Sequence, residues 1–171
     1  MTGVDEPVLG DDFNKKKGKK EDSIEQNIRK ILNDVPYGVL STQIKGQPYS
    51  SLVSVVFTPD LKYGVFATPQ TTRKYKVLSQ EDRISMLLDN RALFPNDLMK
   101  IEAVTITGKA SEIKRGKDYD QLSDLLLKKH SYLKELINAH TCALFRIEPV
   151  RFFYTRRFHE VYQWILPNSQ P

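Results

Sequence analysis

Phe66-Ala-Thr-Pro-Gln-Thr-Thr-Arg-Lys-Tyr-Lys-Val-Leu78 is the stretch where the pattern of this chain changes from strand to helix. An apolar, β-branched run ends at Pro69, which cannot donate a backbone hydrogen bond inside a sheet. Two threonines follow, and then a basic segment compatible with a short helix over residues 72–80. The stretch therefore predicts the end of a strand, a turn and the start of a helix.

The start of this helix also predicts an anion-binding cradle. Thr71 or Thr72 can cap it, and the N–H groups of its first turn have no partner within the helix. Arg73 and Lys74 add two cations beside those groups, so a phosphate would fit there. The alternative is that Thr72 only caps a helix whose Arg73, Lys74 and Lys76 form a solvated face.

The segments before this stretch predict a helix and an antiparallel meander. Apolar residues recur at helical spacing over residues 23–34, after a capping-box pattern at Asp22-Ser-Ile-Glu25 and before Pro36. The period then changes to that of strands, which we expect at Tyr37–Ile44, Pro48–Phe57 and Tyr63–Thr68, with turns at Lys45-Gly46 and Pro59-Asp60.

The segments after it predict further strands and two paired helices. We expect strands at Arg83–Asp89, Ile101–Ile113, Ala143–Phe158 and Val161–Leu166, and helices at Asp118–Lys129 and Ser131–Ala139. Neighbouring apolar residues in Arg83–Asp89 suggest burial on both faces, Gly108 interrupts the next strand, and residues 91–99 are typical of a loop. Six or more strands with few, peripheral helices predict a mainly β (α+β) fold, an antiparallel β-barrel of Greek-key character.

Composition indicates one globular domain over residues 22–171. The net charge is +5, but residues 1–21 hold five lysines and five acidic residues. This neutral tail predicts a solvated, disordered leader rather than a nucleic-acid-binding arm. No apolar run reaches the roughly 18 residues of a membrane span, and the single cysteine, Cys142, suits a reducing compartment. We expect a cytoplasmic protein with no nucleic-acid or membrane partner.

An ordered set of short motifs resembles a known family. The set consists of Tyr37-Gly-Val-Leu-Ser-Thr42, Gly46-Gln-Pro-Tyr-Ser-Ser-Leu-Val53, Phe66-Ala-Thr68, Thr72-Arg-Lys74, Leu88-Asp-Asn-Arg91 and Val104-Thr-Ile-Thr-Gly-Lys-Ala110. In this order it resembles the FMN-binding split barrels related to pyridoxamine 5′-phosphate oxidase, over roughly residues 22–166. The resemblance implies a six-stranded split barrel that forms a homodimer, with FMN in clefts at the subunit interface.

The resemblance also implies which residues contact FMN. Thr72, Arg73 and Lys74 match the family motif that holds the FMN phosphate, in agreement with the cradle predicted from the residues themselves. Thr68, at the end of a strand, matches another position near the flavin.

The strand that includes Ser50, Ser51, Leu52 and Val53 matches the family strand whose backbone runs along the edge of the isoalloxazine ring. On the same comparison, Ser51 reaches the phosphate or the ribityl chain. The alternative is that the serines here are ordinary barrel positions.

The chain departs from the family's named enzyme at several positions. Pyridoxamine 5′-phosphate oxidases carry an arginine where this chain has Ser51, a lysine where it has Val56, and a glutamine near Ala103. Near the C-terminus, Arg157-Phe-His159 resembles the Arg-x-His pair that binds the pyridoxal phosphate substrate; the alternative is an exposed strand edge or a loop. These differences separate the prediction of FMN binding from the prediction of oxidase activity.

Two further groups of residues are candidates for the cleft. The family supplies an aromatic residue from the partner's C-terminal strands, and Tyr154 or Trp164 would take that role; core or interface packing is the alternative. Asn90 and Arg91 follow a strand and would line the cleft. The alternative for Arg91 is a surface ion pair with Glu102 or Asp97.

Other cofactor chemistries have less support in the residues. The spacing of His130, His140 and His159 is not that of a zinc site, and we expect no metal centre. Some split barrels resemble haem-handling proteins, in which one of these histidines would ligate iron. The alternative is that each is a surface or capping residue.

Two classes of function remain. The first is an FMN-dependent oxidoreductase that moves a hydride or electrons between a pyridine nucleotide or small oxidisable molecule and an acceptor such as oxygen. The second is a non-catalytic protein that stores or carries FMN, haem or a deazaflavin. The catalytic residues and the small-molecule substrate are not predicted by the sequence.

Overall fold

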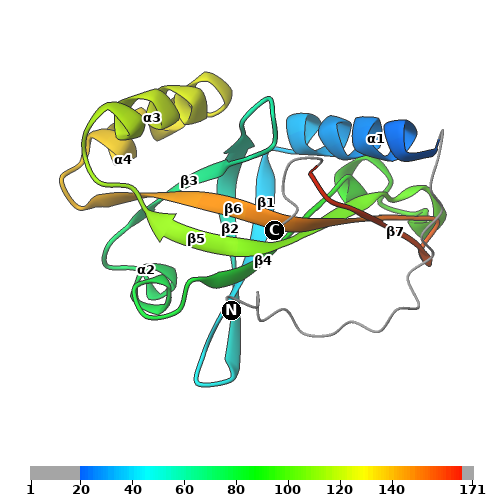
Figure 1. The fold of residues 1–171 in the computed structure, drawn as a ribbon, viewed down its shortest axis with the longest axis horizontal. Helices are drawn as coiled ribbons and strands as arrows, with labels where there is room; N and C mark the ends of the chain where they lie inside the picture. The colour runs from blue at the N-terminus through cyan, green and yellow to red at the C-terminus, as the bar shows by residue number, and fades with distance from the viewer. Residues whose placement is uncertain (1–19, 167–171) are drawn as a thin grey trace.

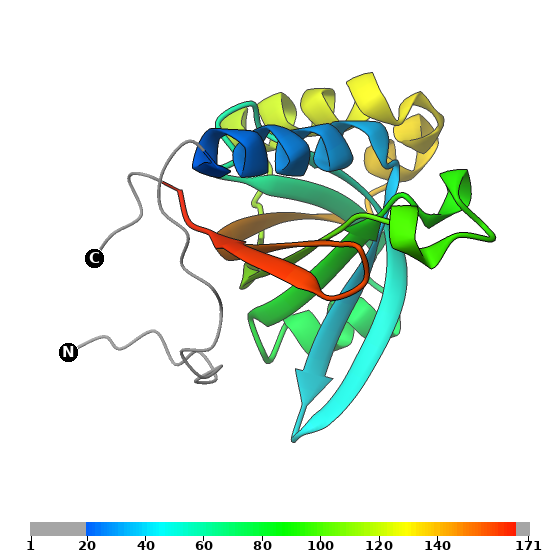
Figure 2. The same ribbon diagram turned by 90° about the vertical axis from the view of Figure 1, so that its right-hand side faces the viewer.

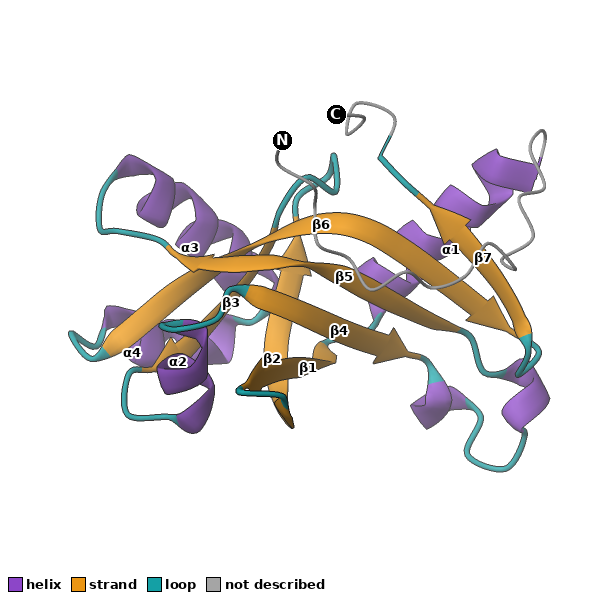
Figure 3. Cartoon of the chain, turned by 60° about the horizontal axis from the view of Figure 1, so that its bottom comes forward, coloured by secondary structure: helices purple, strands orange, loops and turns teal. Residues whose placement is uncertain are grey.

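A computed structural model describes residues 20–166, in which an antiparallel barrel is surrounded by four α-helices (Figures 1 and 3). The strands are β1 (Tyr37–Ile44), β2 (Gln47–Phe57), β3 (Gly64–Pro69), β4 (Arg83–Asp89), β5 (Ala103–Glu112), β6 (Cys142–Arg156) and β7 (Glu160–Trp164). The helices are α1 (Lys20–Asp34), α2 (Arg73–Leu78), α3 (Lys117–Lys129) and α4 (Lys134–Asn138), and single 3₁₀ turns lie at Arg91–Leu93, Leu98–Lys100 and Ser131–Leu133.

Six strands close into the barrel. Their order is β3-β2-β1-β4-β5-β6, and β3 pairs back onto β6 to complete the ring. The neighbours β4-β1-β2-β3 have the spatial order of a Greek key. β7 pairs with the C-terminal part of β6, on the edge whose N-terminal part pairs with β3. The predicted six-stranded antiparallel split barrel is therefore confirmed, with β7 as an additional strand.

Alternation of apolar and polar residues fills the barrel. Leu40, Met86 and Ile106 point inward from β1, β4 and β5 and are fully buried. The inner cluster also includes Ile28 and Leu32 of α1, which therefore packs against the barrel as its predicted apolar face requires. Figure 2 shows α1 and α3 both above the barrel, and the β1–β2 hairpin extending away from them.

A second apolar layer lies outside the barrel. Val56 of β2, Val65 of β3 and Leu144 of β6 face outward and are covered by Leu126 of α3 and Ile137 of α4. The predicted helix pair is thus present, although a 3₁₀ turn replaces the first turn of the second helix. This layer covers only one end of the outer face of β2.

Two backbone features match predicted interruptions. Lys45 and Gly46 both have positive φ, at 50° and 78°, as a tight hairpin turn of the primed type requires. At Gly108 the register of β5 on β6 shifts, and a Cβ there would lie 2.3 Å from the Glu148 carbonyl oxygen. Glycine is the residue that permits this close approach.

Three expectations differ from the structure. α1 begins at Lys20, before the proposed capping box, so Lys20 and Glu21 belong to a helix; the rest of the proposed tail lies outside the described residues. The expected burial of Arg83–Asp89 on both faces is wrong, because Leu87 on the outer face is only half-buried. Strand ends elsewhere differ by one to two residues, as is usual for frayed ends. Within the described part, no helix is long and apolar enough to cross a membrane.

Candidate functional site

The barrel is split between β2 and β3. β2 pairs with β1 from Gln47 to Ser54, but with β3 only from Val55 to Phe57. Over residues 47–54, β2 therefore has a strand partner on one side only among residues 20–166. Backbone N–H and C=O groups on the open side are available to a ligand. Ser50, Ser51, Leu52 and Val53, predicted to contact a flavin through their main chain, lie along this open edge.

α2 begins where β3 leaves the other side of the split. Thr72 is its N-cap: its Oγ1 donates to the Pro69 carbonyl at 2.9 Å and accepts from the Tyr75 N–H at 3.3 Å. The buried Thr68 has its Oγ1 2.9 Å from that of Thr72, and since the Thr72 proton is already donated, Thr68 is the donor of this pair. The capping role weighed for Thr72 is confirmed, and Thr68 orients the cap.

The two cations of the cradle have no acidic partner in the described part of the chain. The Arg73 guanidinium lies over the Tyr49 ring, 5.0 Å from its centre, and so connects α2 to β2 across the split. Lys74 is half-buried, and desolvation lowers the pKa of its ammonium group. A bound anion would offset that desolvation, because an opposite charge favours the protonated amine.

Two adjacent serines on the open edge have different environments. Ser50 points outward and is exposed, with its Oγ 3.0 Å from that of Ser41. Ser51 lies opposite the buried Leu40, on the inner face, and its Oγ is buried without a hydrogen-bond partner. An unsatisfied buried hydroxyl costs stability, and at such a position it is a ready donor or acceptor for a ligand.

The next positions of β2 change from open to covered. Leu52 points outward with 70% of its surface exposed, whereas Val53 belongs to the barrel core. Val56, where the named family enzyme has a lysine, is 8% exposed under α3 and α4. A lysine at this position would place an unpaired charge in that apolar layer. Ala103, near which the glutamine of the named enzyme falls, is half-buried at the start of β5.

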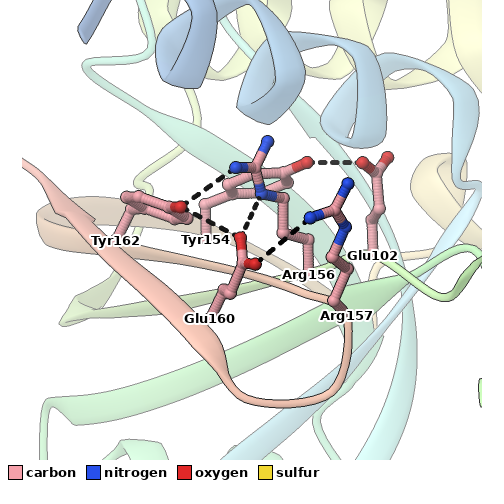
Figure 4. Close-up of polar contacts among 6 residues, drawn as sticks. All are labelled: Glu102, Tyr154, Arg156, Arg157, Glu160 and Tyr162. Atoms are coloured by element: carbon pink, nitrogen blue, oxygen red, sulfur yellow. Dashed lines mark hydrogen bonds and ion pairs between the residues drawn. The ribbon is translucent and has the colours of Figure 1, made fainter. Parts of the chain in front are cut away.

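The two aromatic candidates lie in the core of their own chain. Tyr154 is fully buried, and its hydroxyl donates to Glu102 Oε1 at 2.5 Å (Figure 4). Burial and this carboxylate raise the pKa of Tyr154, which keeps the phenol protonated. Trp164 is 8% exposed and packs edge-on against Phe152, with ring centres 5.2 Å apart. Core packing, the alternative considered for Tyr154 and Trp164, is therefore confirmed for both, because neither ring has a face open for stacking against a ligand.

Asn90 and Arg91 lie at the end of β4 and make local contacts. The Asn90 side-chain oxygen accepts from the Glu102 backbone N–H at 2.8 Å. Arg91 grips Asp89 with two hydrogen bonds of 2.7 and 2.6 Å, and this pair lowers the pKa of Asp89 despite its partial burial. The alternative that Arg91 pairs with Glu102 or Asp97 is therefore wrong. Its partner is Asp89, which lies two residues before it in the chain.

A pocket that the sequence did not predict opens on the outer face of the sheet. Its volume is about 850 Å³, within the range of small-molecule sites. Val39, Leu52 and Leu87 form its floor as one row across β1, β2 and β4. Of the candidate residues named from the sequence, those that line this pocket are Leu52, Asn90, Arg91 and Arg157, while the cradle residues do not. The sequence did contain a signal for this pocket, namely apolar residues at outward positions of three strands. It could not be used, because the sequence does not show which strands pair.

Charged side chains from the β6–β7 hairpin form one end of this pocket (Figure 4). Glu160 accepts from Arg156 Nε at 2.8 Å and from the Tyr162 hydroxyl at 3.0 Å, and these bonds lower the pKa of Glu160. Arg157 lies 3.5 Å from the same carboxylate, at a turn where its φ is positive at 47°. The Arg157-Phe-His159 motif is therefore the exposed turn weighed as its alternative.

The three histidines have separate environments, and residues 20–166 contain no group of three possible metal ligands. His140 and His159 are exposed. His130 is 1% exposed, and both ring nitrogens are engaged: Nε2 is 3.0 Å from the Val55 carbonyl and Nδ1 is 3.1 Å from the Tyr132 hydroxyl. His130 is buried but is the C-cap residue of α3, so the capping role is confirmed for it and the surface position is not. In this arrangement neither ring nitrogen is open to ligate iron.

Solved structures share this fold at low sequence identity. A haem-binding protein from Mycobacterium smegmatis matches with a TM-score of 0.74 and 16% identity, covering 83% of this chain and 57% of that one. HutZ, the haem storage protein from Vibrio cholerae, matches with 0.65 and 17%, covering 74% and 89%. A FAD-binding protein from Mesorhizobium loti matches with 0.62 and 15%, covering 75% and 91%. The chain thus spans a little over half of the mycobacterial protein, and at these identities the likeness shows the fold alone.

The comparison with curated proteins found no match. The profile of the pyridoxamine 5′-phosphate oxidase family matches residues 24–164, which include the barrel, the split and the cradle. The chain therefore belongs to the pyridoxamine 5′-phosphate oxidase family.

Proposed function

We propose that this protein binds FMN at the split between β2 and β3, beside the start of α2, and acts as an oxidoreductase on a small molecule. The observation that carries the proposal is the open edge of β2 beside two cations that lack an acidic partner, Arg73 and Lys74. Neutral backbone groups suit the polar rim of a flavin ring, and the cations suit its phosphate. Family membership supports the same ligand.

The residues of the cradle and of the open edge of β2 fit FMN. Arg73 would offer a planar fork to two phosphate oxygens, Lys74 a compact charge, and the first turn of α2 its N–H groups, with Thr72 holding that turn in place through its cap. The unpartnered Ser51 hydroxyl would gain a hydrogen bond from the ligand. Without the family arginine and lysine at Ser51 and Val56, the phosphate would be held by fewer charges than in the named enzyme.

When bound, FMN would supply the hydride or electron transfer. The chain's own contribution is to bind, orient and shield the ring, since the open edge of β2 offers main-chain groups and the exposed Leu52 an apolar surface. No acid or base is required of the cradle for this role.

The proposal includes a homodimer with the cofactor at its interface. Exposed apolar side chains gather around the pocket on the outer face of the sheet: Leu52 at 70%, Tyr37 at 51%, Leu93 at 72% and Met99 at 56% exposure. A concentration of this kind marks an interaction surface on a small protein. A second copy bound there would cover Leu52 and enclose the neighbouring edge of β2.

The second candidate is a protein that stores or carries a cofactor without catalysis, with haem or a deazaflavin in place of FMN. Two structural neighbours, from Mycobacterium smegmatis and Vibrio cholerae, are haem proteins, which favours this class. Haem ligation by His130 is disfavoured, because both of its ring nitrogens already form hydrogen bonds within the protein.

An absorption spectrum and an FMN titration of the purified protein test the proposal. We expect flavin bands, bleaching on addition of NADH or NADPH, and a dimer by light scattering. Arg73→Ala with Lys74→Ala should weaken FMN binding by more than tenfold, because each charge-assisted contact is worth roughly 1.5–3 kcal/mol. Lys76→Ala, which removes an exposed cation from the same helix, is the matched control. Unchanged FMN affinity in the double variant would reject the cradle, a Soret band would favour haem, and flavin without bleaching would favour a carrier.

A further inference from the structure

Just beyond the end of β1, the side chain of His130 contacts a β2 carbonyl that has no partner in β1. β1 begins at Tyr37, opposite Ser54, so the next residue of β2 has no β1 partner. The carbonyl of that residue, Val55, instead lies 3.0 Å from His130 Nε2. Val55 is also the position where β2 begins to pair with β3. The imidazole therefore holds β2 at the point where the barrel splits.

This contact fixes the tautomer and the direction of a longer hydrogen-bond chain. A carbonyl can only accept, so Nε2 carries the proton and Nδ1 of the neutral ring is an acceptor. Tyr132 must then donate its hydroxyl proton to Nδ1, across 3.1 Å. The Tyr132 oxygen is left to accept from Ser54 Oγ, 3.0 Å away.

Tyr37 extends the same chain to the pocket. Its ring stacks on His130, with centres 6.5 Å apart, and the neighbouring Tyr132 hydroxyl raises the pKa of Tyr37. Tyr37 also lines the pocket beside Leu52. The neutral form of one buried histidine thus orders groups of β1, β2 and the turn after α3 around the open edge.

We infer that His130 and Tyr132 form a proton-sensitive clamp that holds the open edge of β2 in its ligand-binding position. The inference rests on the proposed function, because the edge concerned is the one assigned to FMN. Protonation of His130 removes the only acceptor for the Tyr132 proton on the ring, and it places a cation in a site that is 1% exposed. Release of residues 130–133 from β2 relieves both costs.

On balance, the surroundings of His130 favour its neutral form. Burial is the main cause of its lowered pKa, and the adjacent Lys129 ammonium contributes in the same direction, while the Val55 carbonyl opposes. Lys129 is itself fixed, since its Nζ donates to the Leu32 and Val35 carbonyls at the end of α1 at 2.8 and 2.9 Å. Tyr37, Tyr132 and Ser54 complete the surroundings with hydroxyl groups. The clamp is therefore closed at neutral pH and opens in acid.

FMN titrations between about pH 5 and pH 8 test the clamp. The FMN phosphate itself gains a proton near pH 6, so wild type is compared with His130→Gln, which can keep both hydrogen bonds but does not titrate. We expect the dissociation constant of wild type to rise on acidification by roughly two- to tenfold more than that of His130→Gln, the change equivalent to one net hydrogen bond. His140→Gln, at an exposed histidine, should behave as wild type.

Tyr132→Phe separates the clamp from histidine titration alone. It keeps the ring but removes the hydroxyl, so we expect FMN to bind two- to tenfold more weakly at pH 8 and with less pH dependence. Two results would overturn the inference: parallel pH profiles of FMN affinity for wild type and His130→Gln, or a Tyr132→Phe profile equal to that of wild type. Either would mean that protonated His130 stays in place and donates from Nδ1 to the Tyr132 oxygen instead of accepting from it.

NMR of the FMN-free protein distinguishes failure of the clamp from failure of the proposed function. The amide signals of Ser54 and Val55 should follow the titration of His130 in wild type and not in His130→Gln. If FMN does not bind at any pH, the proposed function fails, and these signals still decide whether the clamp exists. If they do not follow His130, the clamp is rejected.

Discussion

The two halves of β2 differ in what covers them. From Gln47 to Ser54 the strand pairs only with β1 and carries the exposed Leu52, whereas from Val55 to Phe57 it pairs with β3 and lies under α3 and α4. We call these the open half and the closed half. One strand thus supplies both a ligand edge and a core element, and the change between them falls at the residues that His130 and Tyr132 hold.

The largest expected effect comes from placing a charge in each half. Val56→Lys buries an ammonium group among the apolar side chains of α3 and α4, and we expect it to lower the free energy of unfolding by roughly 3 kcal/mol. Leu52→Lys, at an exposed position of the open half, should change the free energy of unfolding of the single chain by less than about 0.5 kcal/mol, when both variants are measured at a protein concentration low enough to keep the chain monomeric. Urea denaturation measures both.

The same pair tests the proposed dimer. Leu52→Lys should leave the fold intact while it weakens self-association, because it places a charge in the exposed apolar surface. Equal destabilisation by both variants would contradict the division of β2 into halves. A stable Leu52→Lys dimer would show that the second copy binds elsewhere.

Prediction from sequence succeeded where the signal was local. The strand–turn–helix around Thr72 and the barrel class follow from period, turn residues and caps, each within about ten residues. The pocket could not be predicted because its signal is not local: Val39, Leu52 and Leu87 meet only through the pairing of three strands. The burial of His130 was not predicted for the same reason, since its partner Val55 is 75 residues away in the chain.

The pH dependence of stability tests the boundary between the halves. Burial lowers the pKa of His130 in the folded state below its ordinary value of 6.5, so the unfolded chain binds the proton more tightly. The stabilisation from neutral His130 is therefore complete above pH 6.5 and is lost as the pH falls through the folded-state pKa. In this window the histidine contributes a slope of up to about 1.4 kcal/mol per pH unit.

Urea denaturation of wild type and His130→Gln over this pH range measures the effect as the difference between their slopes. Wild type should lose stability faster on acidification, whereas His140→Gln should follow wild type because His140 is exposed. Identical slopes for wild type and His130→Gln would mean that His130 titrates normally in the fold, and the boundary would then not depend on its neutral form.

The smallest effect on stability, but the most specific for the open half, is expected at Ser51. Its buried Oγ has no partner, so Ser51→Ala removes an unsatisfied group and should leave the free energy of unfolding unchanged or raise it by up to about 1 kcal/mol. Ser50→Ala removes an exposed hydroxyl that contacts Ser41 and should have little effect on either stability or ligand binding. If the open half binds FMN, Ser51→Ala should weaken that binding severalfold while the protein remains as stable as wild type. A loss of stability without a loss of affinity would show instead that Ser51 is a structural position, and that the ligand edge lies nearer to Leu52.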